Sequence, residues 1–311
     1  MDYFLIRSSC PVCGSKFGRT LFSCRFTEPP IRGYLEGFYK DQGDIEFQYL
    51  ENASYILEEC SFCGLIYQKQ IPSDFLAEKL YTQWINPERV FESNVEGNDL
   101  GYFADFACQI MTMVSFFKKR PAELKVLDYG SGWGLWARMA RAFGCDVYAL
   151  ELSQKKTAYS KSCGINIIHE DALKDHHFDF INIDQFLEHI SNPPEVLRRV
   201  VEILKTGGVT RVSVPEGRDI KRRLKVNDWS VDRWAKNSLN GISPLEHINC
   251  FQWQSMMVLG RNAGLESIRM PLGLQYRFGA SPMSLKSLLK PLYVNFFKKG
   301  TCQFFKKTAR F

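Results

Sequence analysis

Four cysteines stand in two matched pairs, and their spacing is that of metal ligands. Cys10 and Cys13 form one Cys-x-x-Cys-Gly sequence, and Cys60 and Cys63 form a second one after 46 intervening residues. Each turn can point two thiolates at one ion, and two such turns supply the four sulfur ligands of a tetrahedral zinc site. Four protein ligands fill all coordination positions of a tetrahedral ion, so the predicted zinc is structural. Dithiol redox chemistry is the alternative, and the matched second pair weighs against it.

A glycine-rich segment ends one predicted strand and opens a helix: Asp128-Tyr-Gly130-Ser-Gly132-Trp-Gly134. Glycines at such a turn let the backbone approach a ligand that side chains would exclude. A dinucleotide fingerprint needs Gly-x-Gly-x-x-Gly, but here the third glycine comes one residue early and Leu135 stands at the expected place. The segment therefore disfavours a pyrophosphate cradle.

Acidic residues follow the next two predicted strands. Glu151 comes 21 residues after Gly130, where a carboxylate can accept hydrogen bonds from ribose hydroxyls. Asp171 follows the third strand, where it can receive an adenine amino proton. Together with Asp128, these acids suit a cationic nucleoside without phosphate, and S-adenosylmethionine is such a ligand.

Two Glu-His sequences follow later strands. Glu188-His189 comes after the fourth predicted strand, at the edge where open α/β sheets bind ligands, and Glu246-His247 comes after the fifth. A histidine beside a carboxylate can take a proton from an acceptor near neutral pH. We therefore treat Glu188, His189 and His247 as a candidate catalytic group. A purely structural role and a metal site stay open as alternatives.

The elements that must position these residues alternate beyond Pro121. Apolar stretches predict strands at 126–127, 147–150, 165–168, 178–183 and 209–214, and helical periodicity predicts helices near 133–143, 153–162 and 193–205. This alternation is typical of right-handed βαβ units in a parallel sheet. Before Pro121, apolar spacing predicts one helix from Ser73 or Asp74 and a second over 98–119.

Length and composition limit the possible classes. The chain has 311 residues, of which 45% are hydrophobic and 24% charged, so a disordered or fibrous chain is disfavoured. The longest nearly uncharged apolar stretch, 106–117, is shorter than a membrane-spanning helix. The first seven residues show neither a basic leader nor a long apolar stretch, so we expect a cytoplasmic protein.

The net charge of +6 is unevenly distributed. No acidic residue follows Glu266, and nine Lys or Arg fall in the last 45 residues, so the rest of the chain carries 31 basic against 34 acidic residues. Any anionic partner is therefore expected in these last 45 residues. Within them, the aromatic and basic side chains of 281–311 could contact an anionic membrane. Nucleic acid is disfavoured as a partner, and the sequence does not indicate an oligomeric state.

Residues 122–270 resemble the class I S-adenosylmethionine-dependent methyltransferases. The resemblance is carried by 126–134, Ala149-Leu-Glu-Leu-Ser153, Glu170-Asp-Ala172, Leu187-Glu-His-Ile190 with Pro193, and Leu204-Lys-Thr-Gly-Gly-Val209. Tyr129 is a departure, since the family has a small residue there. The resemblance implies an α/β fold, a Rossmann-like methyltransferase sheet with helices on both faces.

The resemblance also implies which residues bind the cofactor. Asp128, Gly130 and Gly132 would line the methionine end of S-adenosylmethionine, and Glu151 would bind the ribose. Asp171 and Ala172 would bind the adenine, and Gln185 and Phe186 would lie beside the transferable methyl group.

A further resemblance concerns the metal alternative. Gln185, Glu188, His189 and His247 are similar to the ligands of magnesium-dependent O-methyltransferases of quinone synthesis and small-RNA ends, with Gln185 in place of a carboxylate.

The order of modules is similar to that of bacterial C-methyltransferases of deoxysugars, whose further C-terminal domain has no counterpart in this sequence. We expect methyl transfer to an O, N or C nucleophile of a small-molecule or glycan-type acceptor, such as a sugar or another precursor of the cell envelope or of secondary metabolites. Two alternatives stay open. One is an RNA-modifying methyltransferase that uses the basic tail, and the other is a non-catalytic zinc-containing binding protein with a degenerate cofactor fold.

The sequence thus predicts four parts. They are a zinc-binding module at 1–72, a helical linker or lid at 73–120, a methyltransferase domain at 121–280 and a basic aromatic tail at 281–311.

Overall fold

The computed structural model describes residues 2–40, 42–92, 100–233, 235–279, 289, 291–293 and 299–309. The chain forms two compact units, each assembled from segments that are distant in the sequence. Unit 1 comprises Met1–Glu92, Leu187–Pro194 and Val214–Leu259, and unit 2 comprises Ser93–Phe186, Glu195–Ser213 and Gly260–Phe311. The four paired cysteines therefore belong to unit 1, and the glycine-rich segment belongs to unit 2.

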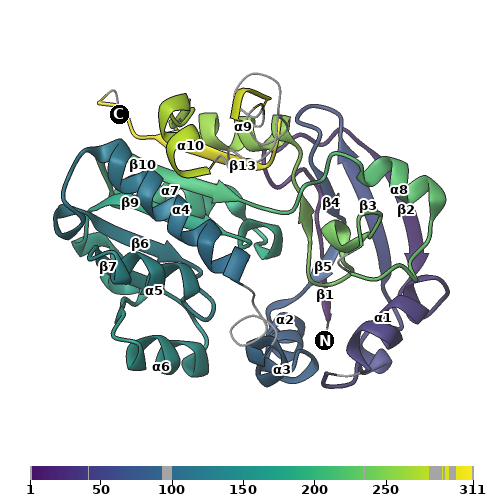
Figure 1. The fold of residues 1–311 in the computed structure, drawn as a ribbon. Coiled ribbons are helices and arrows are strands. Elements are labelled where there is room, and N and C mark those ends of the chain that lie inside the picture. The colour runs from purple at the N-terminus through teal and green to yellow at the C-terminus, as the bar shows by residue number, and fades with distance from the viewer. Residues whose placement is uncertain are drawn as a thin grey trace. The chain divides into compact units, whose positions relative to one another are not determined.

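Unit 2 is built on a seven-stranded mixed sheet with the strand order β12-β13-β10-β9-β6-β7-β8 (Figure 1). The strands from β10 to β8 in this order run parallel, and β13 is antiparallel to both of its neighbours. The strands are β6 (Lys125–Tyr129), β7 (Asp146–Leu150), β8 (Asn166–Ile167), β9 (Phe178–Asp184), β10 (Leu204–Ser213), β12 (Glu266–Ile268) and β13 (Cys302–Lys306). The predicted α/β class with a Rossmann-like sheet is confirmed.

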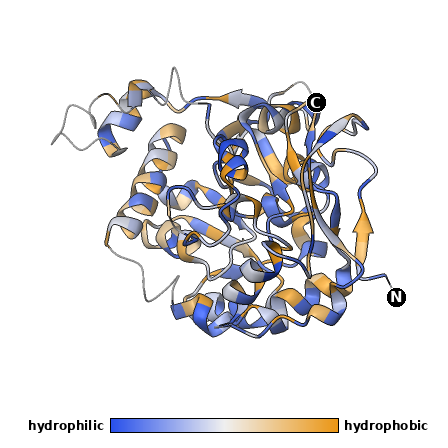
Figure 2. Ribbon diagram, turned by 90° about the vertical axis from the view of Figure 1, so that its right-hand side faces the viewer, coloured by the Kyte–Doolittle hydropathy of each residue, from blue (hydrophilic) through white to orange (hydrophobic). Residues whose placement is uncertain are grey.

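Helices flank this sheet, and four of them lie close to predicted ones, at 100–117, 135–142, 154–162 and 193–203. They are α4 (Leu100–Phe117), η4 (Pro121–Glu123), α5 (Leu135–Ala142), α6 (Gln154–Ser162), η5 (Glu170–Asp175) and α10 (Leu272–Gly279), with α7 (Pro193–Ile203) and α9 (Trp253–Asn262) each continuing across a unit boundary. Many helices in Figure 2 carry hydrophilic and hydrophobic colours side by side, as expected for helices that bury one face. In the core, Trp136 of α5 stacks on Phe180 of the central strand β9.

Within the predicted tail, residues 302–306 form β13, in which Phe305 is buried. β13 lies between β10 and β12, so this segment belongs to the sheet. Most other residues of the predicted tail, including Leu285, Leu288 and Phe296, lie outside the described residues.

Helix α4 is, among the described residues, the one helix long and apolar enough to cross a membrane by length and composition. It packs against α5 and α10, and Phe106, Ile110 and Met113 are buried. A core helix passes the same test, so this is weak evidence for a membrane span.

Unit 1 contains a four-stranded sheet of order β11-β4-β3-β2 and a two-stranded sheet, β1-β5. The strands are β1 (Phe4–Ile6), β2 (Gly18–Arg25), β3 (Ser54–Cys60), β4 (Ile66–Gln68), β5 (Gln70–Pro72) and β11 (Asn249–Cys250). The helices are α1 (Ile31–Tyr39), η1 (Phe47–Tyr49), α2 (Asp74–Lys79), the π-helical η2 (Leu80–Trp84), α3 (Pro87–Phe91), η6 (Leu187–His189), α8 (Ile220–Val226) and η7 (Asn240–Ile242).

One hydrophobic core holds the distant segments of unit 1 together. Phe26 and Tyr55 of the cysteine-rich region pack in the same cluster as Trp84 and as Trp229 and Ile242. The unit therefore extends beyond the predicted 1–72 module, because residues 214–259 contribute both β11 and part of its core.

Candidate functional site

The glycine-rich segment of unit 2 joins β6 to α5 in a conformation that requires glycine. Gly130, Gly132 and Gly134 have φ angles of 72°, 55° and 70°, in the left-handed region that side chains disfavour. A Cβ atom on Gly130 would lie 2.3 Å from the ring of Phe186, whereas one on Gly132 would meet nothing within 4 Å. The backbone at Gly132 is thus open to a ligand.

Glu151 is fixed at this loop by backbone donors. Its Oε2 atom accepts a hydrogen bond of 2.9 Å from the N–H of Gly132, and its Oε1 atom accepts one of 2.9 Å from the N–H of Ser153. Each carboxylate oxygen keeps further acceptor capacity. The side chain can therefore accept hydrogen bonds from two neighbouring hydroxyls of a bound ribose.

Two further segments of unit 2 carry predicted cofactor residues. Asp171 is exposed and Ala172 half-buried in η5, which follows β8. Leu152, directly after Glu151, is 84% exposed. The sequence analysis did not single out Leu152, although the sequence shows an apolar residue directly after Glu151.

Gln185 and Phe186 form the turn after β9. Gln185 has a φ of 50°, and its N–H donates a hydrogen bond of 2.8 Å to the carbonyl of Ser213 at the end of β10. The ring of Phe186 meets that of Tyr129 edge-on, with centroids 5.5 Å apart. Tyr129, the departure from the family pattern, thus supports Phe186 against the glycine loop.

Asp128 is 4% exposed at the end of β6. Burial raises its pKa to about 7, with the charge of Asp184 adding to the shift, while the hydrogen bond from Asn182 and the charge of Arg211 oppose it. A cation bound beside this carboxyl group would favour its charged form.

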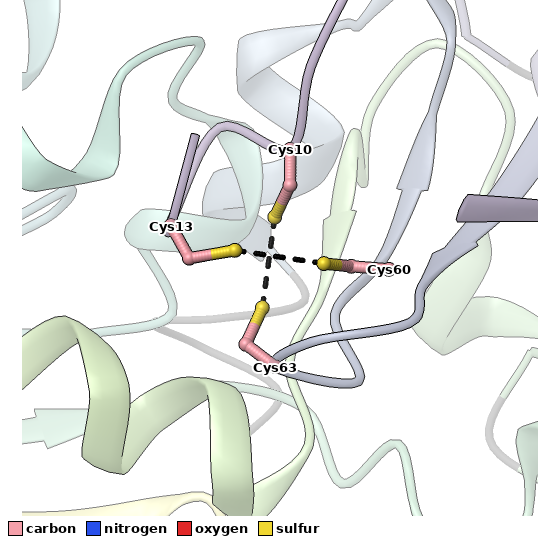
Figure 3. A group of neighbouring side chains, drawn as sticks. All are labelled: Cys10, Cys13, Cys60 and Cys63. Atoms are coloured by element: carbon pink, nitrogen blue, oxygen red, sulfur yellow. Dashed lines mark hydrogen bonds between the residues drawn. The ribbon is translucent and has the colours of Figure 1, made fainter. Parts of the chain in front are cut away.

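The predicted metal ligands Cys10, Cys13, Cys60 and Cys63 point toward one another (Figure 3). The Sγ atoms of Cys10 and Cys63 lie 3.6 Å apart, and those of Cys13 and Cys60 lie 3.5 Å apart. Disulfides would need about 2 Å, whereas zinc–sulfur bonds of about 2.3 Å in a tetrahedron place sulfurs about 3.8 Å apart. The four thiols therefore fit one tetrahedral ion.

The two cysteine turns are built alike. The N–H of Gly14 donates to the carbonyl of Cys10, and that of Gly64 donates to the carbonyl of Cys60, at 2.9 and 3.0 Å. Both glycines have a φ of 73°. This shared geometry explains why each pair is followed by glycine.

Glu188, His189 and His247 also come together, all within unit 1. The His189 Nε2 atom lies 3.9 Å from Glu188 Oε1, and the two imidazole centroids are 4.9 Å apart. Glu188 is 1% and His247 5% exposed. The three side chains, which the sequence analysis grouped as candidates, therefore lie together in the structure.

Backbone carbonyls hold the Nδ1 atoms of both histidines. His189 Nδ1 lies 2.9 Å from the carbonyl oxygen of Glu246, and His247 Nδ1 contacts the carbonyl oxygen of Asn240. A carbonyl can only accept, so each Nδ1 carries the proton and each neutral ring keeps its lone pair on Nε2. Such a lone pair can accept a proton or bind a metal ion.

The surroundings keep His247 neutral. Burial lowers its pKa well below the ordinary value, and the charges of His189 and Arg233 lower it further.

Neighbouring Glu246 is also buried, accepts a hydrogen bond of 3.2 Å from Tyr39 and lies 3.7 Å from Arg233. The Tyr81 hydroxyl lies 3.0 Å from His189 Nδ1. The sequence prediction did not include either tyrosine, because no local pattern relates them to the histidines.

Arg7 and Asn249 hold the segment that carries Glu188 and His189. The Asn249 side chain donates to the carbonyls of Leu187 and Ile190, at 2.9 and 2.7 Å. Arg7 donates to the carbonyl of Ser191 at 3.1 Å. Arg7 lies three residues before Cys10 in the sequence, so it links the chain next to the first cysteine turn to this segment.

A model of a methyltransferase domain matches residues 102–269 of the chain. Among curated proteins, the chain is similar to ubiquinone biosynthesis O-methyltransferases. That of Rickettsia canadensis (strain McKiel) is 28% identical over 101 residues, which are 30% of this chain and 43% of the relative. That of Yersinia pestis (strain Pestoides F) is 27% identical over 97 residues, which are 28% and 40%. The chain spans about two fifths of the length of these relatives.

Two solved structures match the chain at low identity and with TM-scores below 0.5. The plantazolicin methyltransferase BpumL in complex with SAH is 16% identical, with a TM-score of 0.48 over 75% of this chain and 94% of the other. A possible histamine N-methyltransferase from Thermotoga maritima is 20% identical, with a TM-score of 0.37 over 58% and 82%.

Proposed function

The chain belongs to the methyltransferase-domain family, and on that premise we propose that it transfers the methyl group of S-adenosylmethionine to a small-molecule or glycan-type acceptor. The observation that carries the proposal is the position of Glu151, whose carboxylate is bound by the N–H groups of Gly132 and Ser153 beside an open glycine loop. Ser131 in the same loop has a buried hydroxyl with no partner among the described residues, as expected where a polar ligand completes the site.

Each part of the cofactor has a candidate partner in unit 2. Asp128, Gly130 and Gly132 would bind the methionine end, and Glu151 would bind the ribose hydroxyls. Asp171 and Ala172 would bind the adenine, with Leu152 covering one face of the ring. Gln185 and Phe186 would border the methyl group. The bound sulfonium supplies an electrophilic methyl group, so the protein contributes mainly position and charge.

We assign the proton chemistry to Glu188, His189 and His247. An acceptor hydroxyl or carbon acid must lose a proton when it gains a methyl group, and a neutral imidazole can take it. The carbonyls of Glu246 and Asn240 hold both rings in the tautomer that leaves Nε2 as the base. Glu188 would stabilise the imidazolium that forms on His189, because a nearby carboxylate favours the charged ring.

A divalent cation at this cluster is the second candidate role. One carboxylate and two Nε2 atoms can ligate a metal, and ligating histidines commonly donate their other N–H to a backbone carbonyl, as both rings do here. Metal analysis of a Glu188→Gln variant distinguishes the roles. If the cluster acts as a base, the variant keeps the metal content of the wild type. If the cluster ligates a metal, the wild type holds one equivalent beyond the structural zinc, and the variant loses that equivalent while it keeps the zinc.

The four-cysteine cluster would hold the structural zinc. All four ligands come from the protein, so no position is left for a substrate. In this proposal the ion stabilises unit 1.

The function is tested by calorimetry with S-adenosylmethionine. We expect wild-type protein to bind and Glu151→Ala to lose binding, because the ribose loses its acceptor. Asp146→Ala is the matched control, since Asp146 is exposed at the opposite end of β7. Equal affinity of Glu151→Ala and wild type would contradict the ribose assignment.

The acceptor is identified by incubating cell extract with isotope-labelled S-adenosylmethionine and the purified protein. Label in a small molecule or glycan supports the proposed acceptor class. Label in RNA would replace it with RNA modification, and no label with no cofactor binding would favour a non-catalytic binding protein.

A further inference from the structure

A row of three buried polar side chains crosses the centre of the unit 2 sheet. Asp128 of β6 pairs in register with Asn182 of β9, and Asn182 pairs with Arg211 of β10. The three residues are 4%, 0% and 8% exposed. Buried polar groups are costly unless each is hydrogen-bonded, so this row needs an explanation.

Along the row, each side chain donates a hydrogen bond to the next, from Arg211 through Asn182 to Asp128. Arg211 Nη1 donates to Asn182 Oδ1 at 2.9 Å, and Asn182 Nδ2 donates to Asp128 Oδ1 at 2.9 Å. Arg211 can only donate, so it fixes which end of the Asn182 amide faces it. The opposite end, an N–H donor, must then face Asp128.

We propose that Arg211 is a positioning residue that acts through Asn182 to keep Asp128 ionised and oriented toward the cationic methionine end of the cofactor. The inference rests on the proposed binding of S-adenosylmethionine. Without Arg211 the Asn182 amide can turn, which would bring its carbonyl against the carboxylate and disfavour the negative charge. Arg211 touches neither cofactor nor acceptor in this account.

Several other charged or titratable groups act on the row, and they set its electrostatic balance. Asp184 of β9 lies 3.2 Å from Arg211 Nη1 and opposes the ionisation of Asp128. Tyr102 of α4 interacts with Asp184, Asp105 and Asp128, and Cys302 and Asp105 act on Arg211. The charge of Arg211 thus favours the ionised form of Asp128, and the charge of Asp184 opposes it.

The proposal predicts a pH-dependent loss of affinity. The pKa of Asp128 is already about 7 because of burial, and it should rise further when Arg211 is replaced by Leu. A rise of one pKa unit corresponds to a factor of about ten, so Arg211→Leu should bind S-adenosylmethionine about tenfold more weakly near pH 6 and recover by pH 9. Arg211→Lys should show a smaller loss, because it keeps the charge but not the planar geometry.

Calorimetry from pH 6 to pH 9 on wild type, Arg211→Lys and Arg211→Leu measures this effect. Titration of the ligand is the same in all three proteins and cancels in the comparison. In an Asp128→Asn background the Arg211 variants should cause no further loss. An equal loss at every pH, or the same loss in that background, would show that Arg211 only supports folding.

A second measurement does not depend on the cofactor. Carbon-13 NMR of labelled aspartate carboxyls in the ligand-free protein, assigned with Asp128→Asn, should show a higher midpoint in Arg211→Leu than in wild type. Arg211→Lys serves if Arg211→Leu does not fold. An unchanged midpoint overturns the inference. If wild type does not bind S-adenosylmethionine, the proposed function fails, while the NMR titration still decides whether the row controls Asp128.

Discussion

The guanidinium of Arg7 donates a hydrogen bond of 3.0 Å to the side-chain carbonyl of Asn249, which is 242 residues away in the sequence. The amide of Asn249 in turn donates to two carbonyls of the segment that carries Glu188 and His189. Since Arg7 and Cys10 belong to the same N-terminal segment, these hydrogen bonds link the segment of the cysteine cluster to the segment of the histidine cluster within unit 1.

Arg7→Ala should destabilise the protein by about 2 kcal/mol, because the carbonyl of buried Ile248 and the side chain of buried Asn249 lose a charged donor. Chemical denaturation measures the change. Arg19→Ala is the control: its guanidinium pairs with Glu59 while 68% exposed, so it should cost less than about 1 kcal/mol. Equal effects of the two changes would contradict the link through Arg7.

Elemental analysis of purified protein should find one zinc per chain in the four-cysteine cluster. A Cys10→Ser/Cys60→Ser variant should lose the ion and melt at a lower temperature, because structural zinc contributes folding free energy. Cys24→Ser should keep the ion, since Cys24 lies outside the cluster. Zinc retained by the double variant would rule out this site.

His189→Ala and His247→Ala should each lower kcat by roughly 10²- to 10⁴-fold while the affinity for S-adenosylmethionine stays the same, because the base takes part only in the transfer step. Stopped assays with the identified acceptor, together with calorimetry, separate the two quantities. His177→Ala is the control, because His177 is exposed in the loop before β9. Full turnover by both cluster variants would refute the assignment.

Gly130→Ala should abolish cofactor binding and reduce stability more than Gly207→Ala does. Both positions have positive φ angles, of 72° and 81°, which cost an alanine roughly 1–2 kcal/mol. Only Gly130 also faces the ring of Phe186, so the added methyl group forces overpacking of about 1–3 kcal/mol. Removing the ring in a Gly130→Ala/Phe186→Ala variant should recover part of the stability. Equal costs at the two glycines would show that the ring can move aside.

The parallel core of the sheet could be predicted because its signals are local. Apolar strands, the glycine turn and the acids that follow each strand lie within short segments, and Asp128 and Glu151 lie at the ends of β6 and β7 as expected. The cysteine turns are local in the same sense, since each carries its own glycine.

Other features depend on register between distant strands and could not be predicted. Asn182 and Arg211 read as ordinary strand residues until β6, β9 and β10 are aligned, and only then do they form a polar row with Asp128. Arg7 gave no signal either, because its partners are carbonyls, which every residue type possesses. Whether Glu188, His189 and His247 form a base, a metal site or a structural group stays a prediction.

The position of β13 has a consequence for the order in which the chain can fold. Among the described strands, β12 pairs with β13 and with no other, and 33 residues separate the two strands in the chain. A nascent chain that has emerged from the ribosome only as far as Ile268 therefore has a strand with no neighbour to pair with, and β10 presents an open edge. The sheet is complete only once residues 302–306 have been made. A chain that stops before them contains the residues of β12 but has no strand for β12 to pair with, so both β12 and β13 are missing from its sheet.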